Sequence, residues 1–173
     1  MALRIAVEIS GVRQLNRALG VVASAVKDLR PVWEDIYEDF LRRERTLFAR
    51  QGNVGSPSRE VGATSGVWGP WAPLNPEYAA RKRAMGYGSR ILVRTGRLRD
   101  SLTQRGHVDA VFSASPKSMA LGTGTPYAGY HQTGTSRMPR REPLRISEAQ
   151  SRAWVRMIQL FLIESGQFER ENQ

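Results

Sequence analysis

The first residues of the chain alternate between apolar and polar side chains. Apolar side chains occupy every second position from Leu3 to Ile9. A period of two is typical of a strand with one buried face, and Gly11 follows where such a strand would end. We therefore predict a β-strand at the N-terminus.

A long apolar stripe follows this strand. Its steps alternate between four and three residues from Leu15 to Leu47. This spacing predicts a long helix with one buried face. Pro31 lies inside the stripe, and proline removes a helical hydrogen bond and clashes with the preceding turn. We expect a kink or break near Arg30, with Pro31 in the first turn of a second helix. The stripe either packs on the chain's own sheet or is shared with a neighbouring subunit.

A long loop at about 52–70 is predicted next, because this stretch is rich in Gly, Ser and Pro. Trp68 and Trp71 lie at its end and are expected to anchor it to the body of the protein or to a partner. Asn75 and Pro76 are typical of a helix start, so a short basic helix is predicted over 78–85.

The second half of the chain predicts two short helices, a hairpin and a final helix. Thr95 is expected to cap a helix over 96–102, and one helical turn is expected over 127–132. The hairpin joins 108–114 to 118–122. Ser147 and Gln150 form a capping-box pattern at the start of the last helix, which we expect to end near Gly166. Residues 167–173 are then a frayed polar tail.

The length of the chain predicts one domain over residues 1–173. Its parts are a long N-terminal helix kinked near Pro31, a small antiparallel sheet, short helices and a C-terminal helix.

Charge and composition narrow the function classes. Among 173 residues there are 26 Lys and Arg against 16 Asp and Glu, a net charge of +10, which favours acidic or polyanionic partners. The absence of Cys excludes a disulfide scaffold, a Cys-based zinc site and a Cys nucleophile. No apolar stretch is long enough to cross a bilayer and no secretory signal is visible, so we expect no membrane partner and synthesis in the cytoplasm.

The chain carries little that points to catalysis. His107 and His131 are its two histidines, and no G-x-S-x-G elbow is present. His131 as a general base is the weaker hypothesis, and a hydrogen-bonded structural histidine is favoured. The G-x-G at 122–124 is followed by Pro126, so it is interpreted as a tight turn rather than a phosphate loop. We expect no enzyme activity, no metal and no cofactor.

Two kinds of charged surface stand out. The helical spacing of Glu34, Asp35, Glu38 and Asp39 predicts an exposed face, either solvated or between subunits. Arginines gather at 42–50, 81–83, 94–99 and 137–145, where Arg suits bidentate contact with carboxylates or phosphates. For these arginines the alternative roles are contact with another subunit, non-specific contact with DNA, and plain solubility. No specific DNA-reading motif is present.

Four blocks of sequence, in this order and spacing, resemble the phage virion morphogenesis family, the tail-completion proteins of Mu-like and related tailed phages. They are WAPLNPEYAARK (71–82), ILVRTGRLRDSL (91–102), GTGTPYAGYHQTGT (122–135) and MPRREPL (138–144). Two departures are local: the loop before the tryptophans is longer than expected, and Glu142 stands where the family tends to have proline or an aromatic residue.

The resemblance implies a small α+β protein, with a long N-terminal helix on an antiparallel sheet, that acts structurally at the phage head–tail junction. It would complete the tail or join it to the head as a ring around the DNA channel, a hexamer being expected. The implied partners are copies of itself, tail tube or tail terminator proteins, and head-closure or connector proteins, with possible non-specific contact with packaged DNA.

In a ring each subunit presents two different patches to its neighbours. We expect Arg97, Arg140 and Arg141 to be interface donors to the acidic face of Glu34, Asp35, Glu38 and Asp39. Trp68 and Trp71 are candidate anchors. The alternatives are a basic, non-specific DNA-binding protein and a hydrolase that uses His131.

Overall fold

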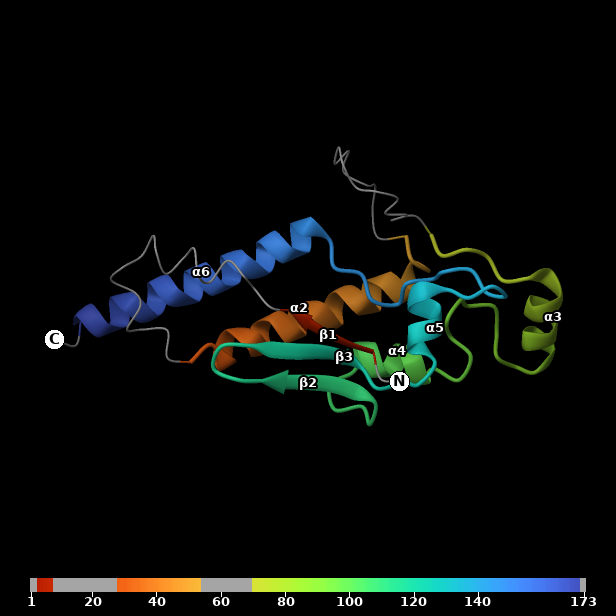
Figure 1. Cartoon of the computed structure of the whole chain (residues 1–173), viewed down its shortest axis with the longest axis horizontal. Coiled ribbons are helices and arrows are strands. Elements are labelled where there is room, and N and C mark those ends of the chain that lie inside the picture. The colour runs from red at the N-terminus through yellow and green to blue at the C-terminus, as the bar shows by residue number, and fades with distance from the viewer. Residues whose placement is uncertain (1–2, 8–27, 54–69, 172–173) are drawn as a thin grey trace. The chain divides into compact units, whose positions relative to one another are not determined.

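The computed structural model describes residues 3–7, 28–53 and 70–171, and the side chains among them from 28 to 164. The elements in chain order are β1 (Leu3–Val7), α2 (Arg30–Ala49), α3 (Pro76–Ala84), α4 (Arg97–Thr103), β2 (Ala110–Ala114), β3 (Met119–Thr123), α5 (Ala128–Thr133) and α6 (Glu148–Glu171) (Figure 1). Helices and a small sheet in this order confirm the predicted α+β class.

The chain divides into two compact units. Unit 1 contains residues 1–4, 41–111 and 122–145, and unit 2 contains residues 5–40, 112–121 and 146–173. The boundaries fall within α2 and within the strands of the hairpin, so both units use parts of the same elements. The single domain expected from the sequence stays a prediction.

Helix α2 starts where the sequence predicted a break. It begins at Arg30 and carries Pro31 in its first turn. The N–H groups of the first turn have no partner within a helix, so the missing N–H of proline costs no hydrogen bond there. Of the predicted stripe, Trp33, Ile36 and Phe40 are all buried in unit 2. The part of the stripe between Leu15 and Val26 lies outside the described residues.

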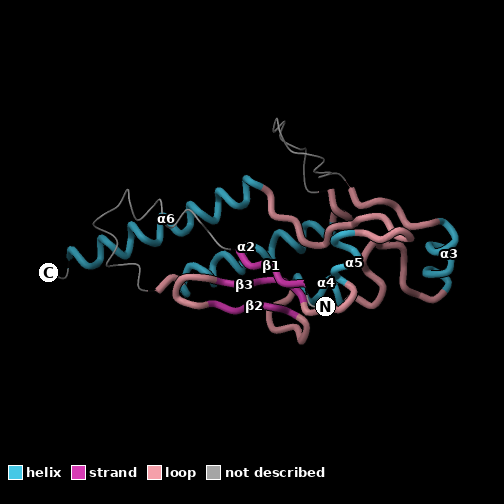
Figure 2. Tube along the Cα trace, in the orientation of Figure 1, coloured by secondary structure: helices cyan, strands magenta, loops and turns pink. Residues whose placement is uncertain are grey.

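The sheet of the chain has three strands in the order β1-β3-β2. Strand β1 confirms the N-terminal prediction, while Ile9 lies outside the described residues. The β2–β3 hairpin closes through a turn in which the Ser115 N–H donates to the Ser118 carbonyl oxygen at 2.8 Å. Figure 2 shows the two strands joined by this turn.

In unit 2, α2 packs on the hairpin. The rings of Tyr37 and Phe112 stack with their centroids 4.1 Å apart. The Trp33 Nε1–H donates to the Ser115 carbonyl oxygen at 3.0 Å, which fixes the helix to the end of β2. The apolar stripe therefore packs on the chain's own sheet, which was one of the two alternatives for it.

Helix α6 also belongs to unit 2. Its Ser147 cap is confirmed, because the Ser147 hydroxyl oxygen accepts from the Gln150 N–H at 3.1 Å. Trp154, Ile158 and Leu162 are buried along one face. The helix runs to Glu171 rather than ending near Gly166, so the predicted end was wrong. Residues 167–171 therefore belong to α6, and residues 172 and 173 lie outside the described part of the chain.

Unit 1 holds the short helices. Asn75 caps α3 as predicted, since its side-chain oxygen accepts from the N–H groups of Glu77 and Tyr78 at 2.9 and 3.2 Å. The predicted Thr95 cap of α4 was wrong. The N-cap is Gly96, because the chain turns there with a φ of 96°, a left-handed conformation that suits glycine.

A buried hydroxyl cluster joins α4 to the end of the hairpin. The Ser101 hydroxyl lies 2.7 Å from that of Thr123, and Thr123 in turn bonds the hydroxyl of Thr125 at 2.9 Å. Leu98 and Leu102 are fully buried on the same helix, as their four-residue spacing predicted. The GTGT segment thus serves as a strand end and turn inside unit 1.

Candidate functional site

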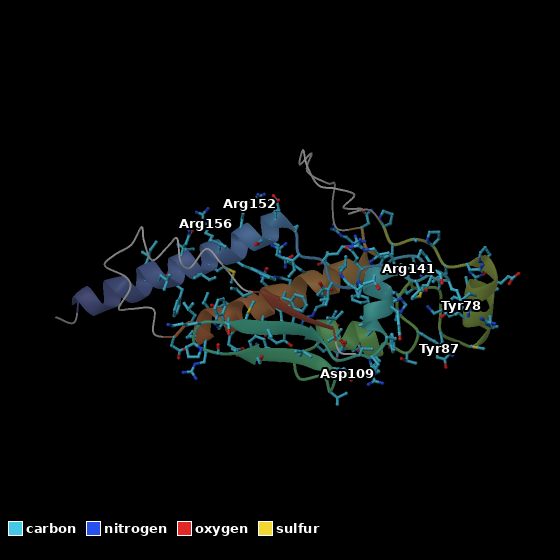
Figure 3. The ribbon with its side chains drawn as sticks, in the orientation of Figure 1. Tyr78, Tyr87, Asp109, Arg141, Arg152 and Arg156 are labelled. Atoms are coloured by element: carbon cyan, nitrogen blue, oxygen red, sulfur yellow. The ribbon has the colours of Figure 1, made fainter. Side chains whose placement is uncertain are left out.

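A cavity of about 990 Å³ lies within unit 1. Its walls come from both ends of α3 and the residues before it, the segment 87–95, helix α5 with the preceding Tyr127, and the segment 137–141. We call it the basic groove. Figure 3 labels three of its lining residues, Tyr78, Tyr87 and Arg141, which lie beside α3 and α5. The volume is at the upper end of that of ligand pockets, which is roughly 300–1,000 Å³.

The lining of the basic groove is strongly one-sided in charge. Four cationic residues line it, namely Lys82, Arg94, Arg137 and Arg141. No Asp or Glu is among the described residues that line it. A concave surface lined by one sign of charge concentrates ions of the opposite sign. The groove is therefore suited to an anionic occupant.

Two of the cations are held firmly by backbone carbonyl groups. Arg141 is buried and donates from Nε to the Ala72 carbonyl oxygen at 2.6 Å and from Nη2 to that of Pro73 at 2.7 Å. Lys82 is buried and its Nζ donates to the Arg90 carbonyl oxygen. Burial, and then the nearby charge of Arg94, lower the pKa of Lys82. Carbonyl groups orient these cations without neutralising them.

Aromatic rings supply much of the remaining wall. The Arg94 guanidinium lies 4.9 Å from the centroid of the Tyr87 ring, a cation–π contact that orients it. The Tyr127 and His131 rings meet edge to face at 6.0 Å. Positive charge next to aromatic faces favours a ligand that brings both negative and apolar groups.

His131 lies in the groove wall as a half-buried residue. Its Nδ1 is buried and has no hydrogen-bond partner within the described structure. Burial, followed by the charge of Arg141, lowers its pKa and keeps the imidazole neutral at pH 7. The described lining contains no carboxylate that would orient this ring as in a catalytic triad.

Two arginines predicted as interface donors are paired within unit 1. Arg97 binds Asp109 through two nitrogens, one of them Nη2 at 2.8 Å from Oδ1. This bond is the largest cause of the lowered pKa of Asp109. Arg140 pairs with Glu142. Arg141, the third predicted donor, is buried in the groove wall. Whether any of the three meets another subunit stays a prediction.

Trp71 is held in the body of unit 1 by its own contacts, and its anchoring of the predicted loop stays a prediction. It is buried, its ring lies edge to face with Phe48 at 5.2 Å, and its Nε1–H donates to the Glu142 carbonyl oxygen at 2.9 Å. The Trp71 N–H donates to the Gln51 carbonyl oxygen at 2.9 Å, which brings the two ends of the segment together. Trp68 and the loop itself lie outside the described residues.

The predicted acidic face is smaller than expected. Glu34, Asp35 and Glu38 are exposed on α2 in unit 2. Asp39 is buried instead, and its Oδ2 accepts from the Trp154 Nε1–H at 2.8 Å. The prediction that Asp39 lies on the exposed face was wrong, because α6 covers this side of α2. The contact of the other three carboxylates with a neighbour stays a prediction.

Sequence reasoning did not find the basic groove as a site. It noted Lys82, Arg94 and Arg137 as members of three separate clusters and did not single out Tyr78 or Tyr87. Lys82 and Arg94 lie inside sequence blocks that carry the family resemblance, and Arg137 directly precedes the last of these blocks. That overlap was the available signal, but the folding that brings them together is not visible in the sequence.

Among the described residues, no group of three or more His, Asp or Glu side chains is placed to hold a metal ion. Among the described helices, none combines the length and apolar character needed to cross a membrane.

Comparison with known proteins identifies a family. The sequence model of the phage virion morphogenesis family matches residues 11–159. No curated protein and no solved structure matches the chain.

Proposed function

The chain belongs to the phage virion morphogenesis family, and from this premise we propose that it completes the phage tail or joins it to the head. A structural role in phage morphogenesis follows from the family itself. The position at the head–tail junction and the assembly into a ring around the DNA channel are our proposal. Its partners there would be copies of itself, with a hexamer expected, tail tube or tail terminator proteins, and head-closure or connector proteins.

The observation that carries the proposal is the extent of the family match. Residues 11–159 include parts of both compact units. The same range contains α2, the hairpin and the whole lining of the basic groove. The family assignment therefore applies to the architecture described above and not to one isolated segment.

The surfaces of the two units support a role in assembly. Unit 2 exposes Glu34, Asp35 and Glu38 on α2, whereas unit 1 carries the basic groove. A closed ring needs two different patches on each subunit, one for each neighbour. Surfaces of opposite charge on one chain meet this need.

Electron microscopy of labelled virions tests the proposed location. A tagged copy of the chain, supplied during infection and marked with gold-conjugated antibody, should place label at the joint between head and tail. Label at the tail tip, on the capsid face or nowhere on the particle contradicts the proposed place. An unrelated tagged capsid protein serves as the control for accessibility of the antibody.

Non-specific DNA binding is the second candidate function, and the net charge of +10 favours it. It predicts affinity for duplex DNA of any sequence that falls steeply as salt is raised. A titration of the protein with duplex DNA at low salt tests this function. A lack of measurable binding under these conditions excludes it.

A further inference from the structure

The cations that line the basic groove differ from several other arginines of unit 1. Four arginines of unit 1 outside the lining each lie in an ion pair with a carboxylate; the pairs are Arg97–Asp109, Arg99–Asp100, Arg140–Glu142 and Arg145–Glu142. In contrast, none of Lys82, Arg94, Arg137 and Arg141 pairs with a carboxylate of the described part of the chain. Positive charge is thus left uncompensated in the basic groove.

This arrangement carries an energetic cost that an anionic ligand would relieve. Lys82 and Arg141 are both buried, so neither charge is fully hydrated. The charge of Arg94 acts on Lys82, and that of Arg141 acts on His131, in each case against the protonated form. A negative group that enters the groove would gain from several cations at once.

The other wall residues indicate what kind of anion fits. Leu74, Leu92, Val93 and Met138 line the groove together with Tyr78 and Tyr87. An inorganic anion or a small acid would leave this apolar surface uncovered. An extended peptide that alternates acidic and apolar side chains would cover both kinds of surface, because its side chains point to opposite sides in turn.

Duplex DNA fits the groove poorly. In its complexes, DNA accepts protein elements into its own grooves rather than entering a cavity. A single nucleic-acid strand would require successive bases to stack on aromatic faces. In the described lining, the Arg94 guanidinium already lies over the Tyr87 ring, and the Tyr127 and His131 rings meet edge to face. The apolar side chains favour a polypeptide.

We propose that the basic groove binds an extended acidic segment of a neighbouring virion protein, with carboxylates at Arg94, Arg137 and Arg141 and apolar side chains against Leu92 and Met138. The identity of the neighbour as a virion component rests on the proposed function, whereas the chemistry of the groove does not. The groove would act as a binding site through which one component of the particle recognises the next.

Peptide binding to the purified full-length chain tests the proposal. The probe is a short fluorescent peptide of alternating glutamate and leucine, and the control peptides replace glutamate with glutamine or with lysine. We expect saturable binding of the glutamate peptide alone, weakened by salt. Equal binding of the glutamine peptide, or no binding of the glutamate peptide, overturns the proposal. So does tighter binding of a short oligothymidylate, which would assign the groove to single-stranded nucleic acid.

Two matched double variants localise the binding. Arg94→Glu with Arg137→Glu reverses two exposed charges of the groove, while Arg152→Glu with Arg156→Glu reverses two exposed charges on α6 in unit 2 (Figure 3). The first should weaken the peptide by about tenfold or more, because two attractive contacts become repulsive. The second should change it by less than about twofold, since screening removes distant charges. Equal losses in both overturn the groove as the site. Circular dichroism of each variant checks that it is folded.

The outcomes separate the two proposals. If the peptide binds but the gold label lies away from the head–tail joint, the basic groove is still a peptide site and the proposed location is wrong. If the label lies at the joint but the peptide does not bind, the proposed location stands and the basic groove is not an acidic-peptide site.

Discussion

Replacement of Gly52 by alanine tests how closely Gly52 packs against Trp71. Gly52 has a φ of +87°, which side chains other than glycine rarely adopt. A Cβ atom added there would lie 2.8 Å from Cδ1, Cγ and the backbone N of Trp71. Trp71 cannot easily move, because its N–H bonds the Gln51 carbonyl oxygen and its ring packs on Phe48. Gly52→Ala therefore combines backbone strain with a steric clash.

The two contributions can be separated in magnitude. A left-handed conformation costs an alanine about 1–2 kcal/mol. Overpacking against a fixed neighbour adds about 1–3 kcal/mol. Gly52→Ala should thus lower the free energy of unfolding by about 2–5 kcal/mol, a large part of the stability of a typical domain.

Gly86→Ala is the matched control. Gly86 also lies in unit 1 with a φ of +81°, but an added Cβ would meet nothing within 4 Å. Its cost should be the backbone strain alone, about 1–2 kcal/mol. The difference between the two variants isolates the clash with Trp71.

Urea unfolding followed by circular dichroism measures both free energies. Because Trp33, Trp71 and Trp154 are buried, tryptophan fluorescence gives a second probe of the same transition. A difference between the two variants below about 0.5 kcal/mol would refute the close packing of Gly52 on Trp71. It would also remove the anchoring role assigned to Trp71.

Three further outcomes follow from single contacts. A double-mutant cycle of Asp39→Ala and Trp154→Phe should give a coupling free energy of about 1.5–3 kcal/mol in urea unfolding, because a buried hydrogen bond to a carboxylate joins them; a coupling near zero contradicts that bond. Since the pKa of His131 is lowered in the folded state, stability should fall as the pH drops from about 6.5 through that lowered pKa, and His131→Gln should flatten this pH dependence; an unchanged slope contradicts the burial. Arg97→Gln should raise the pKa of Asp109 toward its ordinary value, and NMR titration of the carboxyl group checks it; an unshifted titration shows that the pair does not form in solution.

Elements marked by local chemistry could be predicted from the sequence. Pro31 fixed the start of α2, Asn75 that of α3 and Ser147 that of α6, since each acts on backbone groups within its own first turn. The Ser115–Ser118 turn fixed the hairpin in the same way. Such signals are complete within a few residues, so no knowledge of the packing is needed.

Features that depend on distant residues escaped prediction. Asp39 has the helical spacing of an exposed residue, but the indole of Trp154, 115 positions later in the chain, buries it. Gly166 was expected to end α6, yet the helix continues beyond it, because one glycine costs only about 1 kcal/mol in a helix. The basic groove joins separate segments, and its volume exists only after unit 1 has folded.

A role at the head–tail junction predicts a defined failure of particle assembly. Phage that lack this chain should yield separate filled heads and separate tails in electron micrographs of lysates, and a plasmid copy of the gene should restore joined, infectious particles. Joined particles in normal numbers without the chain would contradict a role at the head–tail junction.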